Sequence, residues 1–240
     1  MKAIAVIPAR LGSTRLPRKM LREIAGEALI VRVYRGVRSC SLLEDVVVAT
    51  DSDEILQVCE QQGFHARMTS ASCRNGTERV HEISNSVSAD VYINVQGDEL
   101  LAGSQHIETL LKIMRDAEVQ VGSLKTPAAA DDVNNPNAVK VVTDKSGRAL
   151  YFSRAPIPWD RDGMKPVSYK HLGFYAYRKA ALDCYARWPE SSLEQSERLE
   201  QLRFLENGIP IQVAEVAEDT IRVDAPEDLK KAEEILRRHS

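Results

Sequence analysis

The sequence predicts an α/β protein with a doubly wound, mostly parallel, Rossmann-like sheet. Short apolar runs at residues 3–7, 45–49 and 91–95 alternate with segments of helical apolar spacing. A continuous apolar run is typical of a strand that is buried on both faces, as in a parallel sheet covered by helices. Strands that alternate with helices in this way indicate the doubly wound class.

The first half of the chain supplies most elements of this sheet. Its apolar spacing predicts a further strand at 119–123 and helices at 29–39, 52–62, 78–87 and 106–116. From about residue 127 the pattern changes to strands without intervening helices, at 138–143, 149–152 and 171–177. We therefore expect one domain over residues 1–240 with a mixed β insertion at about 127–178. The remaining chain predicts helices at 180–187, 193–207 and 226–238 and strands at 211–216 and 220–223.

The composition disfavours several classes of protein. A net charge of −3 and an aromatic content of 5% argue against a basic nucleic-acid-binding protein. The four cysteines match no zinc motif, so reduced structural thiols are expected. The apolar start before Pro8 is too short for a signal peptide, and no segment reaches the ~18 apolar residues of a membrane span. We expect a soluble, cytoplasmic protein with no nucleic-acid or membrane partner.

A basic loop follows the first predicted strand. The stretch VIPARLGSTRLPRKM contains four cations among turn-forming residues, namely Arg10, Arg15, Arg18 and Lys19. In α/β folds the loops at the carboxyl ends of strands form the ligand site, where phosphate binds to backbone N–H groups and cations. The spacing matches neither a dinucleotide nor a Walker motif. The loop therefore predicts phosphate binding, with a merely solvated basic loop as the alternative.

Two later predicted strands end in aspartate. Asp98 and Glu99 follow the third apolar run, and Asp224 follows the last predicted strand. Carboxylates suit Mg²⁺, a hard cation that takes oxygen ligands and keeps several waters. Asp98 and Glu99 could alternatively belong to a turn whose carboxylates face solvent. Asp224 could alternatively be an N-cap, with Glu227 three residues later. If Asp98 and Asp224 both face one metal-phosphate site, their carboxylates together bind Mg²⁺.

Two further turns have more than one interpretation. Asp51 also follows a strand, but Asp51 and Glu54 have the spacing of a capping box, which favours a structural role. Asn75, Gly76 and Thr77 form a turn before a helix. That turn either contacts the edge of a base through its backbone groups or only begins the helix.

Eight motifs, in order along nearly the whole chain, resemble those of the CMP-Kdo synthetase family, the 3-deoxy-manno-octulosonate cytidylyltransferases. They are PARLGSTRLPRK, NGTERV, NVQGDE, NPNAVKVV, ALYFSRAPIPWDRD, HLGFYAYR, LEQLR and VDAPEDL. The resemblance implies a single nucleotidyltransferase domain that converts CTP and Kdo, an eight-carbon acidic sugar, into CMP-Kdo and pyrophosphate with Mg²⁺. It also implies a role in lipopolysaccharide or capsule biosynthesis, and a homodimer formed through the 127–178 insertion.

The resemblance further implies the roles of individual residues. The expected catalytic residues are Arg10, Lys19, Asp98 and Asp224, of which the two aspartates hold magnesium. The expected nucleotide-binding residues are Ala9, Arg10, Ser13, Lys19, Asn75, Gly76 and Gln96. The expected sugar-binding residues are Gln96, Arg161, His171, Tyr175, Glu200, Gln201 and Arg154.

Phosphoryl-transfer chemistry fits these roles. The cations of the basic loop suit the charge on the leaving pyrophosphate, and a metal held by the two aspartates suits the α-phosphate. A metal-bound hydroxyl needs no dedicated base, and His171, which begins a strand among apolar residues, is a poor candidate for one. Arg161 or His171 is a suitable partner for the sugar carboxylate.

Several positions depart from the family pattern. Arg18 stands where the family usually has glycine, and Arg222 stands where it has a Gly-x-Gly segment, close enough to Asp224 to alter the metal or sugar environment. The other departures are Met20 and Leu100 for proline, Asn75 for serine and Ala225 for threonine. Two alternatives therefore stay open: transfer of CMP to a related acidic sugar, such as 8-amino-Kdo or another nonulosonate, and a catalytically silent nucleotide-binding regulator.

Overall fold

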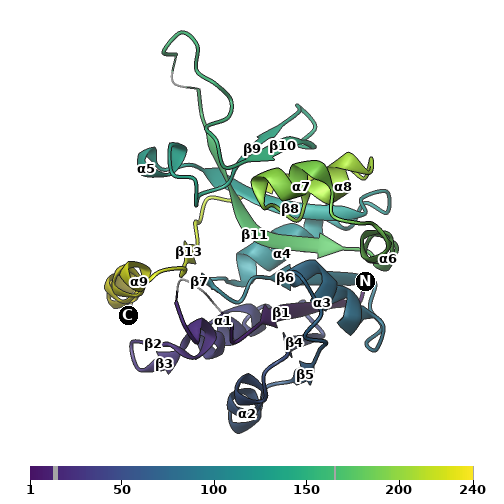
Figure 1. Ribbon diagram of the computed structural model, residues 1–240, viewed down its shortest axis with the longest axis vertical. Coiled ribbons are helices and arrows are strands. Elements are labelled where there is room, and N and C mark those ends of the chain that lie inside the picture. Colours follow the sequence, from purple (N-terminus) through teal and green to yellow (C-terminus); the bar gives the residue numbers. More distant parts are fainter. Residues whose placement is uncertain (13–15, 165, 240) are drawn as a thin grey trace. The chain divides into compact units, whose positions relative to one another are not determined.

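The computed structural model describes residues 1–12, 16–164 and 166–239, and it divides into two compact units (Figure 1). Unit 1 comprises Met1–Glu108 and Thr220–Ser240, and unit 2 comprises Thr109–Asp219. The β-rich insertion expected at 127–178 lies within unit 2. The expectation of a single domain over the whole chain stays a prediction.

Unit 1 is built around four parallel strands in the order β6-β1-β4-β5. Its elements are, in chain order, β1 (Ala3–Ala9), the 3-10 helix η1 (Lys19–Leu21), β2 (Glu23–Ile24), β3 (Glu27–Ala28), α1 (Leu29–Arg38), β4 (Asp45–Thr50), α2 (Asp53–Gln61), β5 (Ala66–Met68), α3 (Gly76–Ser84), β6 (Val91–Val95), β7 (Glu99–Leu100), β13 (Ile221–Arg222) and α9 (Pro226–His239). Helix α4 (Ser104–Ile113) continues from unit 1 into unit 2.

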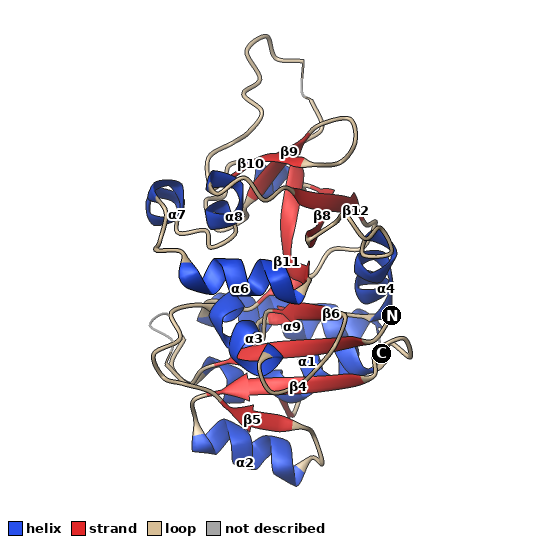
Figure 2. Cartoon of the chain, turned by 90° about the vertical axis from the view of Figure 1, so that its right-hand side faces the viewer, coloured by secondary structure: helices blue, strands red, loops and turns tan. Residues whose placement is uncertain are grey.

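The central strand of this sheet shows why the chain folds as predicted. In β1, Ile4, Val6 and Ile7 are fully buried, and their alternating side chains lie on both faces of the sheet. Helices α1 and α3 both pack against β1 and β4, and Figure 2 shows β4 and β5 side by side with α2 next to β5. Burial on both faces is what a parallel sheet covered by helices requires.

Helix α2 begins differently from the expectation. Its N-cap is Ser52, whose hydroxyl accepts a hydrogen bond from the Ile55 backbone N–H at 3.4 Å. The capping box predicted from Asp51 and Glu54 is therefore wrong, because the N-cap lies one residue later than Asp51. Serine is as good an N-cap as aspartate, and the Asp51 carboxylate pairs with Arg79 instead.

Unit 2 contains a mostly antiparallel sheet with the order β10-β9-β11-β8-β12, in which only β12 and β8 run parallel. Its elements are β8 (Val121–Pro127), α5 (Ala130–Val133), β9 (Lys140–Thr143), β10 (Ala149–Ser153), β11 (Tyr169–Tyr177), α6 (Lys179–Arg187), α7 (Ser192–Glu197), α8 (Leu202–Glu206) and β12 (Ile211–Glu215). The three strands predicted without intervening helices are β9, β10 and β11.

The single helix predicted at 193–207 is wrong, because the structure has two short helices there. Helix α7 ends at Arg198, which adopts a left-handed conformation with φ of 56°. The break brings Glu194 of α7 against Arg203 of α8, and two hydrogen bonds of 2.6 Å join their buried side chains. A continuous helix of this apolar spacing would not place these two side chains together, nine residues apart.

Among the residues that the structure describes, no helix combines the length and the apolar character needed to cross a bilayer.

Candidate functional site

The predicted site residues of unit 1 gather where β1 and β6 end. Ala9 is the last residue of β1, and the exposed Arg10 follows it; Gln96, Gly97 and Asp98 follow β6. Because β1 and β6 are parallel neighbours, their carboxyl ends lie at the same edge of the sheet. Ser13, which the basic loop was also predicted to contribute to nucleotide binding, lies outside the described residues.

Gly97 has no room for a side chain. A Cβ atom there would lie 2.8 Å from the Pro8 carbonyl oxygen and 2.9 Å from the Met20 sulfur. The turn after β6 therefore packs directly against the chain leaving β1. This close approach fixes the position of the next residue, Asp98.

A two-stranded antiparallel ladder brings the second aspartate to the first. Strand β13 pairs with β7, with Arg222 opposite Glu99, and the Val223 backbone N–H donates to the Asp98 carbonyl at 3.0 Å (Figure 1). The Thr220 hydroxyl also donates to the buried Glu99 carboxylate, 121 residues away along the chain. Asp98 and Asp224 therefore lie side by side at the end of the sheet.

Lys19 joins the two aspartates. Its Nζ donates to Asp98 Oδ2 at 2.5 Å and to Asp224 Oδ1 at 2.9 Å, and all three side chains are largely buried. Lys19 lies 79 residues from Asp98 and 205 from Asp224 in the sequence. The solvent-facing turn considered for Asp98 is therefore wrong, since its side chain is only 8% exposed.

Arg222 adds a second cation to this cluster. Its Nε lies 3.2 Å from Asp224 Oδ2 and 3.5 Å from Asp98 Oδ2. Burial alone would raise the pKa of Asp98, but the charges of Arg222 and Lys19 outweigh it and lower that pKa to about 2. Asp98 in turn is the main cause that raises the pKa of Arg222. Asp98 is thus held in its ionised form.

At the start of α9, the side chain that accepts hydrogen bonds from the preceding backbone is that of Asp228. The Asp224 and Ala225 backbone N–H groups both donate to Asp228 Oδ2, at 2.9 and 2.8 Å. Because α9 begins at Pro226, Ala225 and not Asp224 stands directly before the first helical residue, and the N-cap position considered for Asp224 is wrong by one residue. The same contacts explain how α9 begins at Pro226 with alanine, rather than a hydroxyl residue, before it.

The donor set suits a cation that keeps water and phosphate ligands. Over the described residues, no group of three or more His, Cys, Asp or Glu side chains is placed to hold a metal ion. However, Asp98 Oδ1 is buried and has no hydrogen-bond partner, and such an unsatisfied carboxylate oxygen requires an explanation. Two carboxylates fit Mg²⁺, which protein sites bind through one or two carboxylates plus substrate phosphates.

The start of α3 carries the other predicted nucleotide contacts. Asn75 is the N-cap, and its Oδ1 accepts from the Glu78 backbone N–H at 3.0 Å. A Cβ atom on Gly76 would lie 3.0 Å from Gln96 Nε2 and 3.3 Å from Asn94 Nδ2. The Asn75 side chain thus begins the helix, and the contacts of Asn75, Gly76 and Gln96 with a base stay a prediction.

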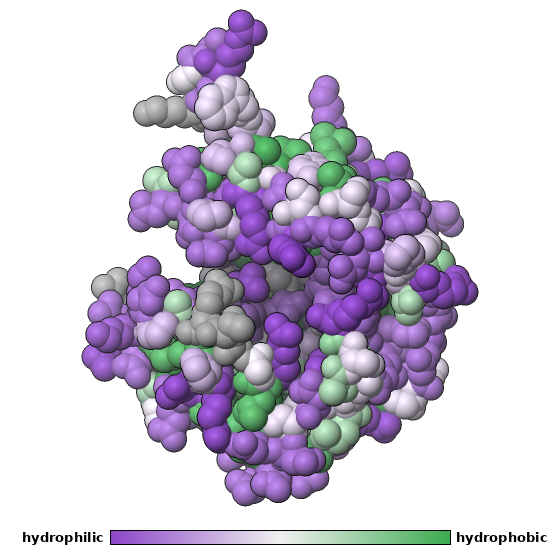
Figure 3. All heavy atoms as spheres, viewed as in Figure 1, coloured by the Kyte–Doolittle hydropathy of each residue, from purple (hydrophilic) through white to green (hydrophobic). Residues whose placement is uncertain are grey.

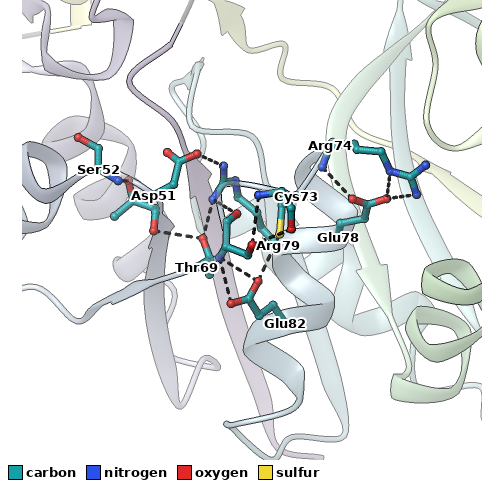
Figure 4. A network of polar contacts seen from close by, with 11 residues as sticks. Asp51, Ser52, Thr69, Cys73, Arg74, Glu78, Arg79 and Glu82 are labelled. Carbon is teal, nitrogen blue, oxygen red and sulfur yellow. Dashed lines mark hydrogen bonds and ion pairs between the residues drawn. The ribbon is translucent and has the colours of Figure 1, made fainter.

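Figure 4 shows the polar network that holds the segment before α3. Arg79 is 4% exposed; its Nη2 pairs with Asp51 and its Nη1 donates to Thr69 Oγ1 at 2.6 Å. Glu82 accepts from the Ser70 backbone N–H and from the Cys73 thiol. The sequence argument missed Arg79, although its position four residues before Ile83 places it on the buried face of the helix.

The predicted sugar residues all lie in unit 2 except Gln96. His171 and Tyr175 are both buried on β11 with ring centroids 5.3 Å apart, and His171 Nε2 lies 2.8 Å from Ser123 Oγ on β8. Glu200 and Gln201 lie between α7 and α8, and Gln201 Nε2 is buried without a partner. The structure thus brings together one pair of the predicted residues, His171 and Tyr175.

The two predicted arginines of unit 2 are differently placed. The Arg154 guanidinium donates to the backbone carbonyls of Pro136, Glu197 and Arg198. These contacts give Arg154 a structural role, and its contact with a sugar stays a prediction. The Arg161 side chain is 89% exposed beside Asp162, so its role also stays a prediction.

Arg18 adopts a backbone conformation that favours glycine. Its φ of 59° lies in the left-handed region, which glycine adopts at no steric cost. The Arg18 side chain forms an ion pair with Glu54 on α2. This ion pair is exposed, and the left-handed backbone conformation of Arg18 is strained for arginine.

A parallel sheet carries a lysine and two aspartates at its strand ends, an arrangement that suits phosphate chemistry. Residues 4–218 match the model of the Cytidylyltransferase family. The chain belongs to this family.

Relatives and solved structures agree with this assignment. The 3-deoxy-manno-octulosonate cytidylyltransferase of Koribacter versatilis is 63% identical over 99% of this chain and 91% of its own, and that of Acidobacterium capsulatum is 52% identical over 98% and 97%. A structure of CMP:2-keto-3-deoxy-manno-octonic acid synthetase complexed with CTP matches with a TM-score of 0.95 at 42% identity, over 100% of both chains. A putative glucose-1-phosphate thymidylyltransferase from Bacillus anthracis, at 14% identity and a TM-score of 0.70 over 98% of this chain and 95% of its own, shares the fold.

Proposed function

We propose that the protein transfers CMP from CTP to Kdo and releases pyrophosphate. The names of the relatives support this reaction, as does the CTP complex of the structure at 42% identity. The observation that carries the proposal is the cluster of Lys19, Asp98 and Asp224, three residues distant in sequence, in which Lys19 Nζ lies 2.5 Å from Asp98 Oδ2 and 2.9 Å from Asp224 Oδ1. Such a cluster places a cation and two carboxylates together at the sheet edge, the groups that phosphoryl transfer uses to hold phosphate and metal.

In this reaction the anomeric hydroxyl of the sugar attacks the α-phosphorus of CTP. A new P–O bond forms, the bond from the α-phosphorus to the β-phosphate oxygen breaks, and the hydroxyl proton leaves to solvent. Charge develops on the pyrophosphate, so cations that reach the β- and γ-phosphates stabilise the transition state. Arg10 and Lys19 of unit 1 are the cations that we assign to this task.

The proposed cofactor is Mg²⁺ on Asp98 and Asp224, of which Asp98 carries an unpartnered buried oxygen. When bound, the metal would neutralise α-phosphate charge and favour the ionised form of a hydroxyl. Lys19 and Arg222 contact the same carboxylates. These cations would therefore move toward the phosphates when the metal takes their place on the aspartates.

The remaining assignments concern the base and the sugar. We assign Ala9, Ser13, Asn75, Gly76 and Gln96 to the nucleotide. We assign Gln96, Arg154, Arg161, His171, Tyr175, Glu200 and Gln201 to the acidic sugar. These roles rest on the family motifs.

The decisive experiment measures pyrophosphate release with CTP and Mg²⁺ in the presence of Kdo, 8-amino-Kdo and a panel of nonulosonates. Release with Kdo supports the proposal. Release only with another acidic sugar replaces the substrate and keeps the reaction. CTP binding without release from any sugar would favour the silent nucleotide-binding regulator.

Assembly and cellular setting belong to the same proposal. We propose a homodimer formed through the segment 127–178, where Trp159, Met164 and Val167 are more than 60% exposed. Light scattering measures the mass, and a monomer would contradict this. On the face in Figure 3 hydrophobic residues form small groups among a hydrophilic majority. The further proposal of a cytoplasmic enzyme of lipopolysaccharide or capsule biosynthesis without a membrane partner rests on the sequence and its family motifs.

A further inference from the structure

The segment that contains Asp224 joins the rest of unit 1 through a very short ladder. Strands β7 and β13 have two residues each, with Arg222 opposite Glu99. A two-stranded ladder is at best marginally stable by itself, even when its strands are longer than these. The position of Asp224 beside Asp98 therefore needs contacts beyond the ladder.

The first of the two strands is firmly placed in unit 1. Strand β7 follows β6 of the main sheet and packs against α1. The approach is close, because a Cβ atom on Gly36 of α1 would clash with the Ala102 carbonyl oxygen. Glu99 and Leu100, the two residues of β7, are buried. Strand β7 thus provides a fixed surface to which the later segment attaches.

The backbone pairing stops before it reaches Thr220. The antiparallel register would place Thr220 opposite Leu101, but Leu101 has a φ of 68°. This left-handed conformation ends the extended strand. The Thr220 side chain makes the next connection instead, because its hydroxyl donates to Glu99 Oε2. Both residues are buried, so the contact is shielded from water.

The chemistry of this contact makes it a strong anchor. Its acceptor is a carboxylate, and a hydrogen bond to such a group contributes more to stability than one between neutral groups. A buried acceptor that loses a donor also carries a desolvation cost. The Thr220 hydroxyl therefore favours the conformation in which β13 lies against β7.

Asp224 lies between this anchor and the start of α9. On the N-terminal side, the Val223 backbone N–H donates to the Asp98 carbonyl at 3.0 Å. On the C-terminal side, Asp228 Oδ2 accepts from the Asp224 backbone N–H at 2.9 Å, and α9 packs against β2 and β13. The backbone is thus held on both sides of Asp224, and Thr220 anchors the N-terminal side.

We infer that Thr220 and Glu99 are positioning residues that hold Asp224 beside Asp98, where the two carboxylates together bind one divalent cation. Thr220 acts through the backbone of β13, and Glu99 receives it on β7. Glu99, the second carboxylate after β6, thereby gains a role other than that of a metal ligand. The metal part of this inference rests on the proposed function, and the hydrogen bond does not.

The first test removes the hydroxyl. We expect Thr220→Val, which keeps the shape of the side chain, to lower the affinity of the free protein for Mn²⁺ roughly tenfold, the scale of one hydrogen bond to a charged group. Titration with Mn²⁺ measures this without turnover. Thr220→Ser keeps a hydroxyl and should restore the wild-type affinity. Thr50→Val, which removes another buried hydroxyl of unit 1, should leave the affinity unchanged.

The second test asks whether Thr220 acts through Glu99. Glu99→Met removes the acceptor together with its charge, so it changes the affinity for Mn²⁺ by itself. In a protein that carries Glu99→Met, Thr220→Val should have no further effect, because the hydrogen bond is already absent. An equal effect of Thr220→Val with and without Glu99→Met would overturn the role of Glu99.

The outcomes separate this inference from the proposed function. Wild-type affinity for Mn²⁺ in Thr220→Val would overturn the positioning role, and so would a wild type that binds no Mn²⁺. If Thr220→Val does not fold while Thr50→Val does, the hydroxyl serves the fold and the positioning role is also wrong. If no sugar acid gives pyrophosphate release but Thr220→Val weakens Mn²⁺ binding, the proposed function fails and the positioning role stands.

Discussion

Lys19 of unit 1 and Lys140 of unit 2 are both largely buried, and their charges are satisfied in different ways. In unit 1, Lys19 and Arg222 are paired with the carboxylates of Asp98 and Asp224. In unit 2, Lys140 is fully buried, and its Nζ donates to the backbone carbonyls of Asn135, Ala138 and Arg154 at 2.6–2.8 Å.

The difference indicates which charges can change partner. A metal and a polyphosphate can together replace an ion pair between side chains, because each ion finds a new partner of opposite charge. Backbone carbonyls are part of the fold and have no substitute. The charged cluster of unit 1 is therefore suited to ligand exchange, whereas the cations on carbonyls in unit 2 stabilise the fold.

The largest effect is expected from Asp98→Asn, which keeps the shape of the side chain and removes its charge. We expect turnover to fall ~10²–10³-fold or more, because a metal ligand and the partner of two cations are lost together. Pyrophosphate release measures it. Asp183→Asn, in an exposed pair with Lys179, is the matched control, and wild-type turnover in Asp98→Asn would refute the metal role.

Lys140→Met should affect stability and leave the nucleotide site intact. It removes the donor to three backbone carbonyls, and we expect the free energy of unfolding to fall by roughly 2–4 kcal/mol. Urea denaturation measures this loss, and CTP affinity should be unchanged. Lys145→Met, at an exposed turn, controls for the lost charge. A weaker CTP affinity in Lys140→Met would break the distinction between the units.

The thiol of Cys73 reports on the network in Figure 4. Burial, and then its hydrogen bond to Glu82, raises the pKa of Cys73 to about 11. At about pH 8 roughly one thiol in 10³ is then ionised, so alkylation should be slow and should accelerate as the pH rises toward 11. Glu82→Gln should speed labelling roughly tenfold at about pH 8. Cys73→Ser identifies the site, and fast labelling of the wild type would contradict the network.

Arg222→Gln tests directly whether a metal ion can replace a side-chain cation on Asp98 and Asp224. Removing one of the two cations that compete for the aspartates should raise the affinity of the free protein for Mn²⁺ severalfold, an electrostatic effect of about 1 kcal/mol. Titration with Mn²⁺ measures it without turnover. Arg237→Gln, on the exposed side of α9, makes the same change in net charge. Equal affinities in the two variants would mean that Arg222 does not compete with the metal.

The smallest effect concerns Arg18. Arg18→Gly relieves the left-handed backbone but loses the pair with Glu54, whereas Arg18→Ala loses the pair and keeps the strain. We expect the glycine variant to be more stable than the alanine variant by about 1 kcal/mol in thermal unfolding. An alanine variant of equal or greater stability would show that no strain exists there.

Local sequence patterns predicted the strands and strand ends that are determined by a single stretch of the chain. The apolar runs located β1, β4 and β6. The carboxylates that follow β6 and the last predicted strand singled out Asp98 and Asp224. The alternatives for Asp224 and Asp98 could be decided only by the pairing of β13 with β7 and by Asp228. Pairing between two-residue strands has no periodicity from which to predict it.

The remaining differences have the same physical origin. Apolar spacing continues through Arg198, so the break between α7 and α8 follows from a left-handed residue and a buried ion pair that the spacing does not reveal. The contact of Ser123 with His171 depends on a bulge that shifts the register of β11. Both features arise from how segments meet, which a single stretch of sequence does not encode.

The ladder between β7 and β13 has a consequence for protein synthesis. Unit 1 consists of two stretches, and all of unit 2 lies between them. A ribosome therefore completes residues 109–219 before it makes Asp224, and a chain stopped after unit 2 contains Lys19 and Asp98 without their partner. The proposed magnesium site thus forms late in synthesis, and an interrupted chain that retains most of its fold would still lack it.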